Sequence, residues 1–134
     1  TDKKAISLYD SLALDIKTAL YEEKYPSAIL YVFIYLESAL KVSVDTLVDK
    51  NVISKRTAER MQNLHLYQLV TVGLRLLLNK EELPDQLVEK FSEVNRMRNG
   101  IIHSAEMNIR KEDAVKAERV VQHIIDALVY RIEH

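Results

Sequence analysis

Apolar residues recur at steps of three and four along most of the chain, the spacing that places them on one face of an α-helix. The first such segment covers residues 4–23 and is expected to end at Tyr25-Pro26, because a residue before proline avoids helical backbone angles. A second segment starts at Pro26, where a missing N–H costs a helix nothing, and stops near residues 49–51. Its apolar stripe is wide, which predicts a central helix covered on more than one side.

The third periodic segment spans residues 55–79, and Ser54 is its predicted cap. Its first part, residues 55–63, is polar enough that a separate short helix or a kink is equally compatible with the pattern. Gly73 interrupts the second part at a cost of about 1 kcal/mol relative to alanine, which suggests a close helix crossing there.

A fourth helix is expected from Pro84 to Gly100, since glycine often adopts the left-handed conformation that closes a helix. A fifth starts near Ile109 and continues to the end of the chain. Short connections between long amphipathic helices favour antiparallel neighbours. The pattern therefore predicts an all-α fold, an up-and-down bundle of four to five helices.

Composition narrows the class of protein further. A chain of 134 residues with 48% hydrophobic and 29% charged residues predicts one globular domain over residues 1–134. Two glycines and two prolines are too few for the many turns of a β-sandwich or barrel. The absence of cysteine excludes disulfides, thiol catalysis and thiolate metal sites. The formal net charge of −1 provides no global attraction to nucleic acid or membrane, so any anion site must be local.

The start of the chain and its apolar runs bear on where the protein is located. The first residues run directly into an amphipathic segment without a secretory signal. The two longest apolar runs are broken by Glu37 and Arg75, short of the roughly 20 residues that cross a bilayer. We therefore expect a cytoplasmic protein with no membrane partner. The start at Thr1 and the end at His134 suggest a domain cut from a longer protein.

One segment combines residues suited to chemistry. Arg98 continues the apolar series Leu87, Phe91 and Val94 of the fourth predicted helix, so its guanidinium should point inward and need an anionic partner or a polar cleft. If the chain turns at Gly100, His103 folds back near this arginine. Such a pair suits a phosphodiester, because the guanidinium holds the phosphate while an imidazole, which titrates near neutrality, moves a proton.

The string RNGIIH at residues 98–103 resembles the R-x4-H motif of the HEPN superfamily (higher eukaryote and prokaryote nucleotide-binding domains), whose members are all-helical bundles of about this size. The resemblance implies a metal-independent endoribonuclease that works as a homodimer, with two motifs facing each other in one composite cleft. It implies that Arg98 binds the scissile phosphate, His103 transfers protons and Asn99 holds the geometry. The RNA's own 2′-hydroxyl would be the nucleophile, and no cofactor would be needed.

The same resemblance implies a biological setting. Many members of the superfamily act in toxin–antitoxin, phage-defence or RNA-processing systems, so an antitoxin or another partner protein is expected. One subgroup carries a tyrosine two positions before the histidine, where this chain has Ile101. The tyrosine-linked nucleotide modification of that subgroup is therefore not expected here. A non-catalytic helical module that binds a protein partner or a nucleotide is the alternative function, and a plain structural bundle is a third.

Each candidate residue also has a structural interpretation. Arg98 could simply pair with a carboxylate such as Glu37 or Glu93, and Asn99 could be a helix-end residue. Glu37 could pair with Lys41 one turn later, which we favour, or face the bundle and orient Arg98.

Local charge suggests where RNA would bind. Arg96, Arg110 and Lys111, together with the motif arginine, outnumber the single acidic residue between positions 96 and 111, and this excess could guide RNA. No metal is expected, because the four histidines lack ligand-pair spacing. The absence of a glycine-rich phosphate loop excludes the usual nucleotide-hydrolase design. Tyr31 and Tyr35 are interpreted as core or dimer packing rather than as platforms for RNA bases.

Overall fold

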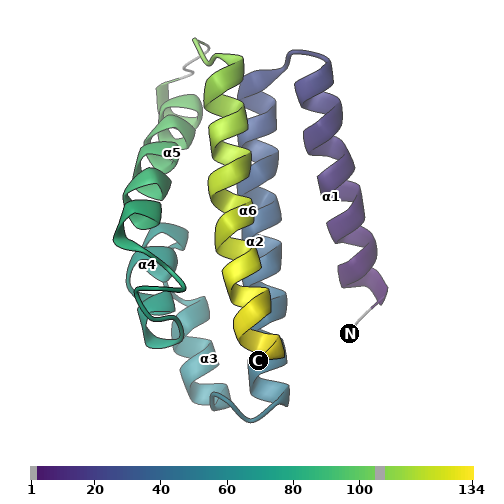
Figure 1. Ribbon diagram of the computed structural model, residues 1–134. Helices are drawn as coiled ribbons and strands as arrows, with labels where there is room; N and C mark the ends of the chain where they lie inside the picture. The colour runs from purple at the N-terminus through teal and green to yellow at the C-terminus, as the bar shows by residue number, and fades with distance from the viewer. Residues whose placement is uncertain (1–2, 105–107) are drawn as a thin grey trace.

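The protein is an all-α helical bundle (Figure 1). The computed structural model describes residues 3–104 and 108–134, with side chains described from residue 10 onward. These residues contain six α-helices and one short 3₁₀ segment, η1, and no strand. The elements are α1 (Lys3–Tyr21), α2 (Tyr25–Asp49), α3 (Lys55–Gln62), α4 (Leu66–Thr71), η1 (Gly73–Leu76), α5 (Asp85–Ser104) and α6 (Lys111–Glu133). The predicted all-α class is confirmed, and the described residues contain one helix more than the four to five expected.

Helix α2 is the centre of the bundle. It packs against α1 on one side and α6 on the other, and it also contacts α3 and α5. Its wide apolar stripe, predicted from the sequence, is buried by these neighbours. By length and composition α2 could also cross a membrane, although half of its most apolar stretch is buried within the bundle. Its position at the centre accounts for its apolar character.

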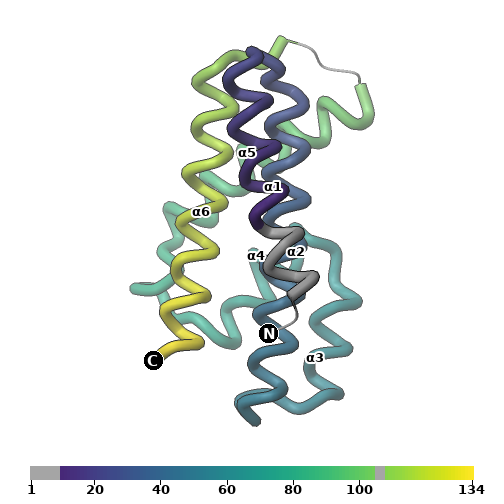
Figure 2. The backbone as a smooth tube through the Cα atoms, turned by 90° about the vertical axis from the view of Figure 1, so that its right-hand side faces the viewer, coloured from purple at the N-terminus to yellow at the C-terminus, as the bar shows by residue number. Residues whose placement is uncertain are grey.

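The four long helices alternate in direction along the chain. In Figure 1, α1 and α5 run upward, whereas α2 and α6 run downward and lie side by side. The same arrangement is visible after a quarter turn (Figure 2). The short elements α3, α4 and η1 carry the chain from the lower end of α2 to the start of α5. The end of α5 and the start of α6 therefore meet at the upper end of the bundle.

The core joins these helices through large apolar side chains. Phe33 on α2 and Phe91 on α5 are both buried, with ring centroids 5.9 Å apart. Ile124 and Leu128 contribute from α6, and Ile16 contributes from α1. Fully burying one such side chain contributes roughly 1.5–3 kcal/mol to folding, so the contact between the two phenylalanines fixes α5 firmly against α2.

The third predicted helix is not continuous. Ser54 caps α3 as predicted, since its hydroxyl accepts a hydrogen bond from the Thr57 N–H at 3.1 Å. The chain then leaves the helix, and His65 in an extended conformation starts α4. The option of a separate short helix over residues 55–63 is confirmed, and a single helix over residues 55–79 is wrong. The amphipathic pattern continues through the break because each short piece still buries its own apolar face.

Gly73 opens η1 beneath two leucine side chains. A Cβ atom at this position would lie 2.9 Å from Cδ1 of Leu69 and 3.3 Å from Cδ1 of Leu64. The close approach that the sequence suggested is therefore made by side chains of the same region rather than by a crossing helix. Arg75, two residues later, donates a hydrogen bond to the Leu83 carbonyl and binds Asp85 at 2.6 Å, which ties η1 to the start of α5.

Helix α5 does not end at Gly100. It continues to Ser104, and no glycine in the described part of the chain has a positive φ. Met97 and Ile101, on either side of the glycine, are partly buried and pack against the core. Their packing offsets the cost of about 1 kcal/mol for a glycine inside a helix. The predicted turn at Gly100 is wrong, and His103 lies on the same helix as Arg98.

The continuation of α5 through Gly100 can be tested by Gly100→Ala. Alanine has the higher helix propensity and suits a negative φ, so the free energy of unfolding should rise by about 0.5–1 kcal/mol in chemical denaturation. Gly73→Val is the contrasting variant, and overpacking against Leu69 should lower the free energy of unfolding by about 1–3 kcal/mol. A clear loss of stability in Gly100→Ala would instead indicate a turn at residue 100.

Candidate functional site

Arg98 points inward from α5, as its position in the apolar series predicts. Its side chain is 26% exposed, and its guanidinium carbon lies 5.1 Å from the centre of the Phe33 ring. Its Nη2 atom lies 3.9 Å from Oε1 of Glu37. Glu93, the other carboxylate considered, binds Lys116 instead. Arg98 is therefore held over α2 by one aromatic face and one carboxylate.

The partner of Glu37 differs from the one we favoured. Among the described contacts its ion pair is with Arg98 across the helix interface, and none is formed with Lys41 on the same helix. The reason is the packing of α5 on α2: Phe33 lies one turn before Glu37, so the guanidinium that covers the ring also reaches the carboxylate. The second interpretation of Glu37, as a residue that orients Arg98, agrees with this geometry.

The contacts that hold Arg98 are weak. Glu37 is 53% exposed and the ion pair is 3.9 Å long, so it should contribute under about 1 kcal/mol to stability. A cation over an aromatic ring at a partly exposed site adds about 0.5–1 kcal/mol. Within the described part of the chain, no side-chain hydrogen bond of Arg98 accompanies these contacts. The guanidinium is thus oriented, and it keeps N–H donors for an incoming anion.

His103 lies on a different face of α5. A helix turns by about 100° per residue, so a separation of five residues places His103 about 140° round the axis from Arg98. His103, Asn99 and Arg96 are all exposed, and their spacing of three and four residues aligns them in one row. We call these three residues the α5 polar row. Asn99 is inside the helix, so its interpretation as a helix-end residue is wrong.

The other predicted RNA contacts lie at the start of α6. Arg110 is the residue that caps this helix: its N–H donates to Asp113 at 3.0 Å, and its Nε lies 3.9 Å from the same carboxylate. Lys111 is exposed. Glu106, the single acidic residue of the charge count, lies outside the described residues. Arg110 is therefore partly neutralised, whereas Lys111 is the freer cation of the two.

Asn95 was not singled out from the sequence. Its Oδ1 atom is buried and has no hydrogen-bond partner in the described structure. A buried acceptor left unpaired costs about 1–3 kcal/mol. Its position in the sequence could have indicated this burial, because Asn95 lies four residues after Phe91 and three before Arg98, at the edge of the apolar stripe. The polar atom lies in the same part of α5 as the motif, one turn earlier.

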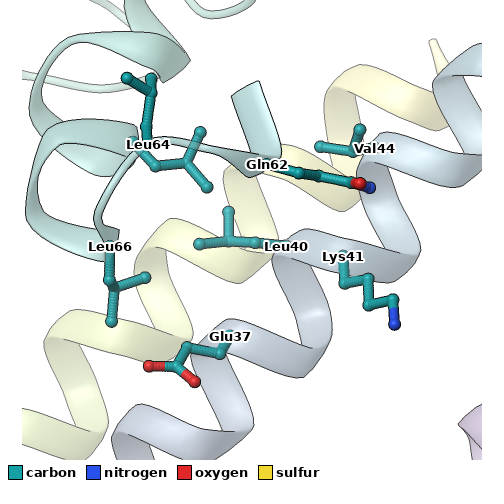
Figure 3. Close-up of a pocket in the computed structure, with 8 residues that line it drawn as sticks. Glu37, Leu40, Lys41, Val44, Gln62, Leu64 and Leu66 are labelled. Atoms are coloured by element: carbon teal, nitrogen blue, oxygen red, sulfur yellow. The ribbon is translucent and has the colours of Figure 1, made fainter. Parts of the chain in front are cut away.

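A shallow groove of about 420 Å³ adjoins the Arg98–Glu37 ion pair (Figure 3). From α2 it is lined by Glu37, Leu40, Lys41 and Val44, and opposite them by Gln62, Leu64, Leu66 and Leu69. In Figure 3, Leu40 extends towards the opposite wall, while the charged ends of Glu37 and Lys41 point in different directions at its edge. The groove is thus apolar inside and carries one acidic and one basic group at its rim.

The remaining electrostatics of α5 involve its contact with α6. The Lys116 ammonium donates a hydrogen bond to Glu93, and this bond, with the attraction between the two charges, holds the pKa of the Glu93 carboxyl below its usual value. Both side chains are substantially exposed, so the pair is a surface contact between helices. Among the described residues, no group of three or more histidine, aspartate or glutamate side chains is arranged to hold a metal ion.

Comparison of the chain with models of known protein families, with curated proteins and with solved structures finds no match. The class of the protein is therefore described by its fold and by the side chains of its candidate site. The protein is an all-α helical bundle in which one helix carries a half-buried arginine and, on another face, an exposed asparagine and histidine.

A double-mutant cycle with Arg98→Met and Glu37→Gln tests whether this ion pair is structural. Because the pair is long and exposed, we expect a coupling free energy under about 1 kcal/mol in chemical denaturation. The single variants should fold with unchanged helicity by circular dichroism. A coupling of about 3 kcal/mol, typical of a buried pair, would assign Arg98 a role in stability instead of in binding.

Proposed function

We propose that the protein is a metal-independent endoribonuclease of HEPN type that cleaves RNA in a composite site between two copies of the chain. The observation that carries the proposal is the placement of the motif on the last two turns of α5. There, Arg98 is oriented by Glu37 and Phe33 and retains donors for an anion, while Asn99 and His103 are exposed. These are the groups that binding and cleaving a phosphodiester requires.

In the proposed reaction the 2′-oxygen of the RNA forms a bond to the adjacent phosphorus, and the bond from phosphorus to the 5′-oxygen breaks. The proton of the 2′-hydroxyl leaves to a base, and the departing 5′-oxygen gains a proton. His103 serves one of these transfers, Arg98 binds the phosphate oxygens as their charge grows, and Asn99 hydrogen-bonds the RNA backbone. The products are a 2′,3′-cyclic phosphate, or the 3′-phosphate from it, and a 5′-hydroxyl.

The geometry of α5 supports a site built from two copies of the chain. On one α5, Arg98 and His103 are about 140° apart, so one chain does not place both on the same phosphate. A two-fold partner packed on this part of α5 would bring the histidine of one chain towards the arginine of the other. Two exposed isoleucines near the ion pair support such a contact: Ile34 on α2 is 46% exposed and Ile102 on α5 is 49% exposed.

The proposal includes a setting. A cytoplasmic RNA-cleaving domain of this type would belong to a toxin–antitoxin, phage-defence or RNA-processing system and would be controlled by an antitoxin or another partner protein. RNA is the proposed substrate, and no metal or cofactor takes part.

A second candidate function is supported by a different surface. The groove beside Glu37 has an apolar interior. Val72 and Leu76, which follow α4 in the chain, are 64% and 76% exposed. Apolar surface of this kind suits a non-catalytic helical module that binds a protein partner. The two functions differ in one measurable property, since only the first cleaves RNA.

Cleavage is tested by incubating the purified protein with mixed RNA in EDTA. We expect fragments with cyclic or 3′-phosphate and 5′-hydroxyl ends. His103→Ala should lower the rate by about 10²- to 10⁴-fold, because it removes the proton-transfer group. Arg98→Ala should lower it at least as far, because it removes the phosphate ligand.

His123→Ala and Arg56→Ala are matched controls, because each removes an exposed side chain of the same type from another helix. Both should cleave at the wild-type rate. Equal cleavage by the wild-type protein and both motif variants would trace the activity to a contaminant. No cleavage by any preparation would favour the partner-binding module.

The composite site is tested by mixing the two inactive variants. If the active pair is Arg98 of one chain and His103 of the other, a mixed dimer of Arg98→Ala and His103→Ala contains one intact pair. We expect the mixture to recover roughly a quarter of the wild-type rate, because half of the dimers are mixed and each has one of two pairs. No recovery after verified subunit exchange, or a strict monomer by light scattering at micromolar concentration, would contradict the shared site.

A further inference from the structure

A second groove runs between α5 and α6, away from the Arg98–Glu37 ion pair. Its volume is about 550 Å³. It is lined by Lys90 from α5 and by Lys111, Glu112, Val115, Lys116, Arg119 and Val120 from α6. We call it the α5–α6 groove.

The α5–α6 groove is strongly positive in a chain with a formal net charge of −1. Four of its lining residues are cationic and one is acidic. Lys116 is neutralised by Glu93. Lys90, Lys111 and Arg119 are exposed, and within residues 3–104 and 108–134 none of them forms an ion pair. Three cations that form no ion pair therefore line one concave surface, with Glu112 as its acidic residue. Lys90 also attracts the Glu93 carboxylate, whose pKa it helps to lower.

The spacing of these cations suits an extended polyanion better than a single anion. Lys111 and Arg119 are eight residues apart on α6, which is about 12 Å along the helix. Lys90 faces them from the other wall of the groove. Val115 lies between the two cations of α6, so apolar surface alternates with charge.

The α5–α6 groove also starts at the end of the bundle where α5 carries the motif. Lys111 is the first residue of α6, at the upper end in Figure 1, where α5 carries His103. Lys90 lies eight residues before Arg98, about 12 Å along α5. Round the axis of α5, Lys90 is about 80° from Arg98 and about 140° from His103. A polyanion bound in the groove would therefore pass round α5 at the upper end of the bundle to reach the motif.

We propose that the α5–α6 groove binds the phosphate backbone of single-stranded RNA and holds the substrate that is cut at the motif. The identity of the polyanion as RNA rests on the proposed function. The charge and concave shape of the groove favour a flexible nucleic-acid strand over a membrane, since a bilayer surface meets protruding cations more readily than cations that line a hollow.

The test is binding of a fluorescently labelled single-stranded RNA in EDTA, measured by anisotropy at several salt concentrations. The variant Lys90→Gln/Lys111→Gln/Arg119→Gln removes the three groove cations that form no ion pair. We expect it to bind at least about tenfold more weakly than wild type, with the slope of log affinity against log salt reduced by about 2. The control Lys55→Gln/Arg56→Gln/Arg60→Gln removes three exposed cations from α3 and should bind within about twofold of wild type.

Equal weakening in both triple variants would overturn the proposal, because overall charge alone would explain the binding. Unchanged RNA affinity in the groove variant, with loss of binding to vesicles containing phosphatidylserine, would also overturn it and assign the groove to a membrane. RNA binding through the groove without cleavage by the wild-type protein would support this proposal and contradict the nuclease. Cleavage with an unchanged KM in the groove variant would contradict this proposal alone.

Discussion

The contact between Phe33 and Phe91 is the interaction on which the site depends. It fixes α5 against the central helix α2 at 5.9 Å between ring centroids. Two turns after Phe91, the guanidinium of Arg98 lies over the Phe33 ring, and it meets Glu37 one turn further along α2. An arginine that would otherwise be a solvated side chain is therefore oriented by the core itself, without a strong ion pair.

The helical period then separates the functions of neighbouring residues on α5. Arg98 is directed inward because it continues the buried series, whereas Asn99 and His103 are exposed because they follow by one and five residues. The continuous helix through Gly100 makes this separation rigid. The site that we propose, which uses both Arg98 and His103, would for this reason draw them from two chains.

Positive side chains are concentrated around α5. The formal net charge of the chain is −1. Three cations that form no ion pair nevertheless line the α5–α6 groove, and the Arg96 side chain lies in the α5 polar row. Both features share α5, so the helix that carries the motif also forms one wall of the proposed RNA groove. Helix–helix packing thus creates a local positive field, although the net charge of the whole chain is close to zero.

The sequence by itself determined the all-α class, the central position of α2, the cap at Ser54 and the inward direction of Arg98, because helical periodicity and capping are local properties. Only the tertiary structure decided that residues 55–79 break into short pieces and that α5 continues past Gly100, since burial of Met97 and Ile101 outweighs the local preference of glycine. It also decided that Glu37 meets Arg98 rather than Lys41, and that Lys90 faces Arg119 across a groove. These are contacts between residues distant in the chain, and no local pattern encodes which helix faces will meet.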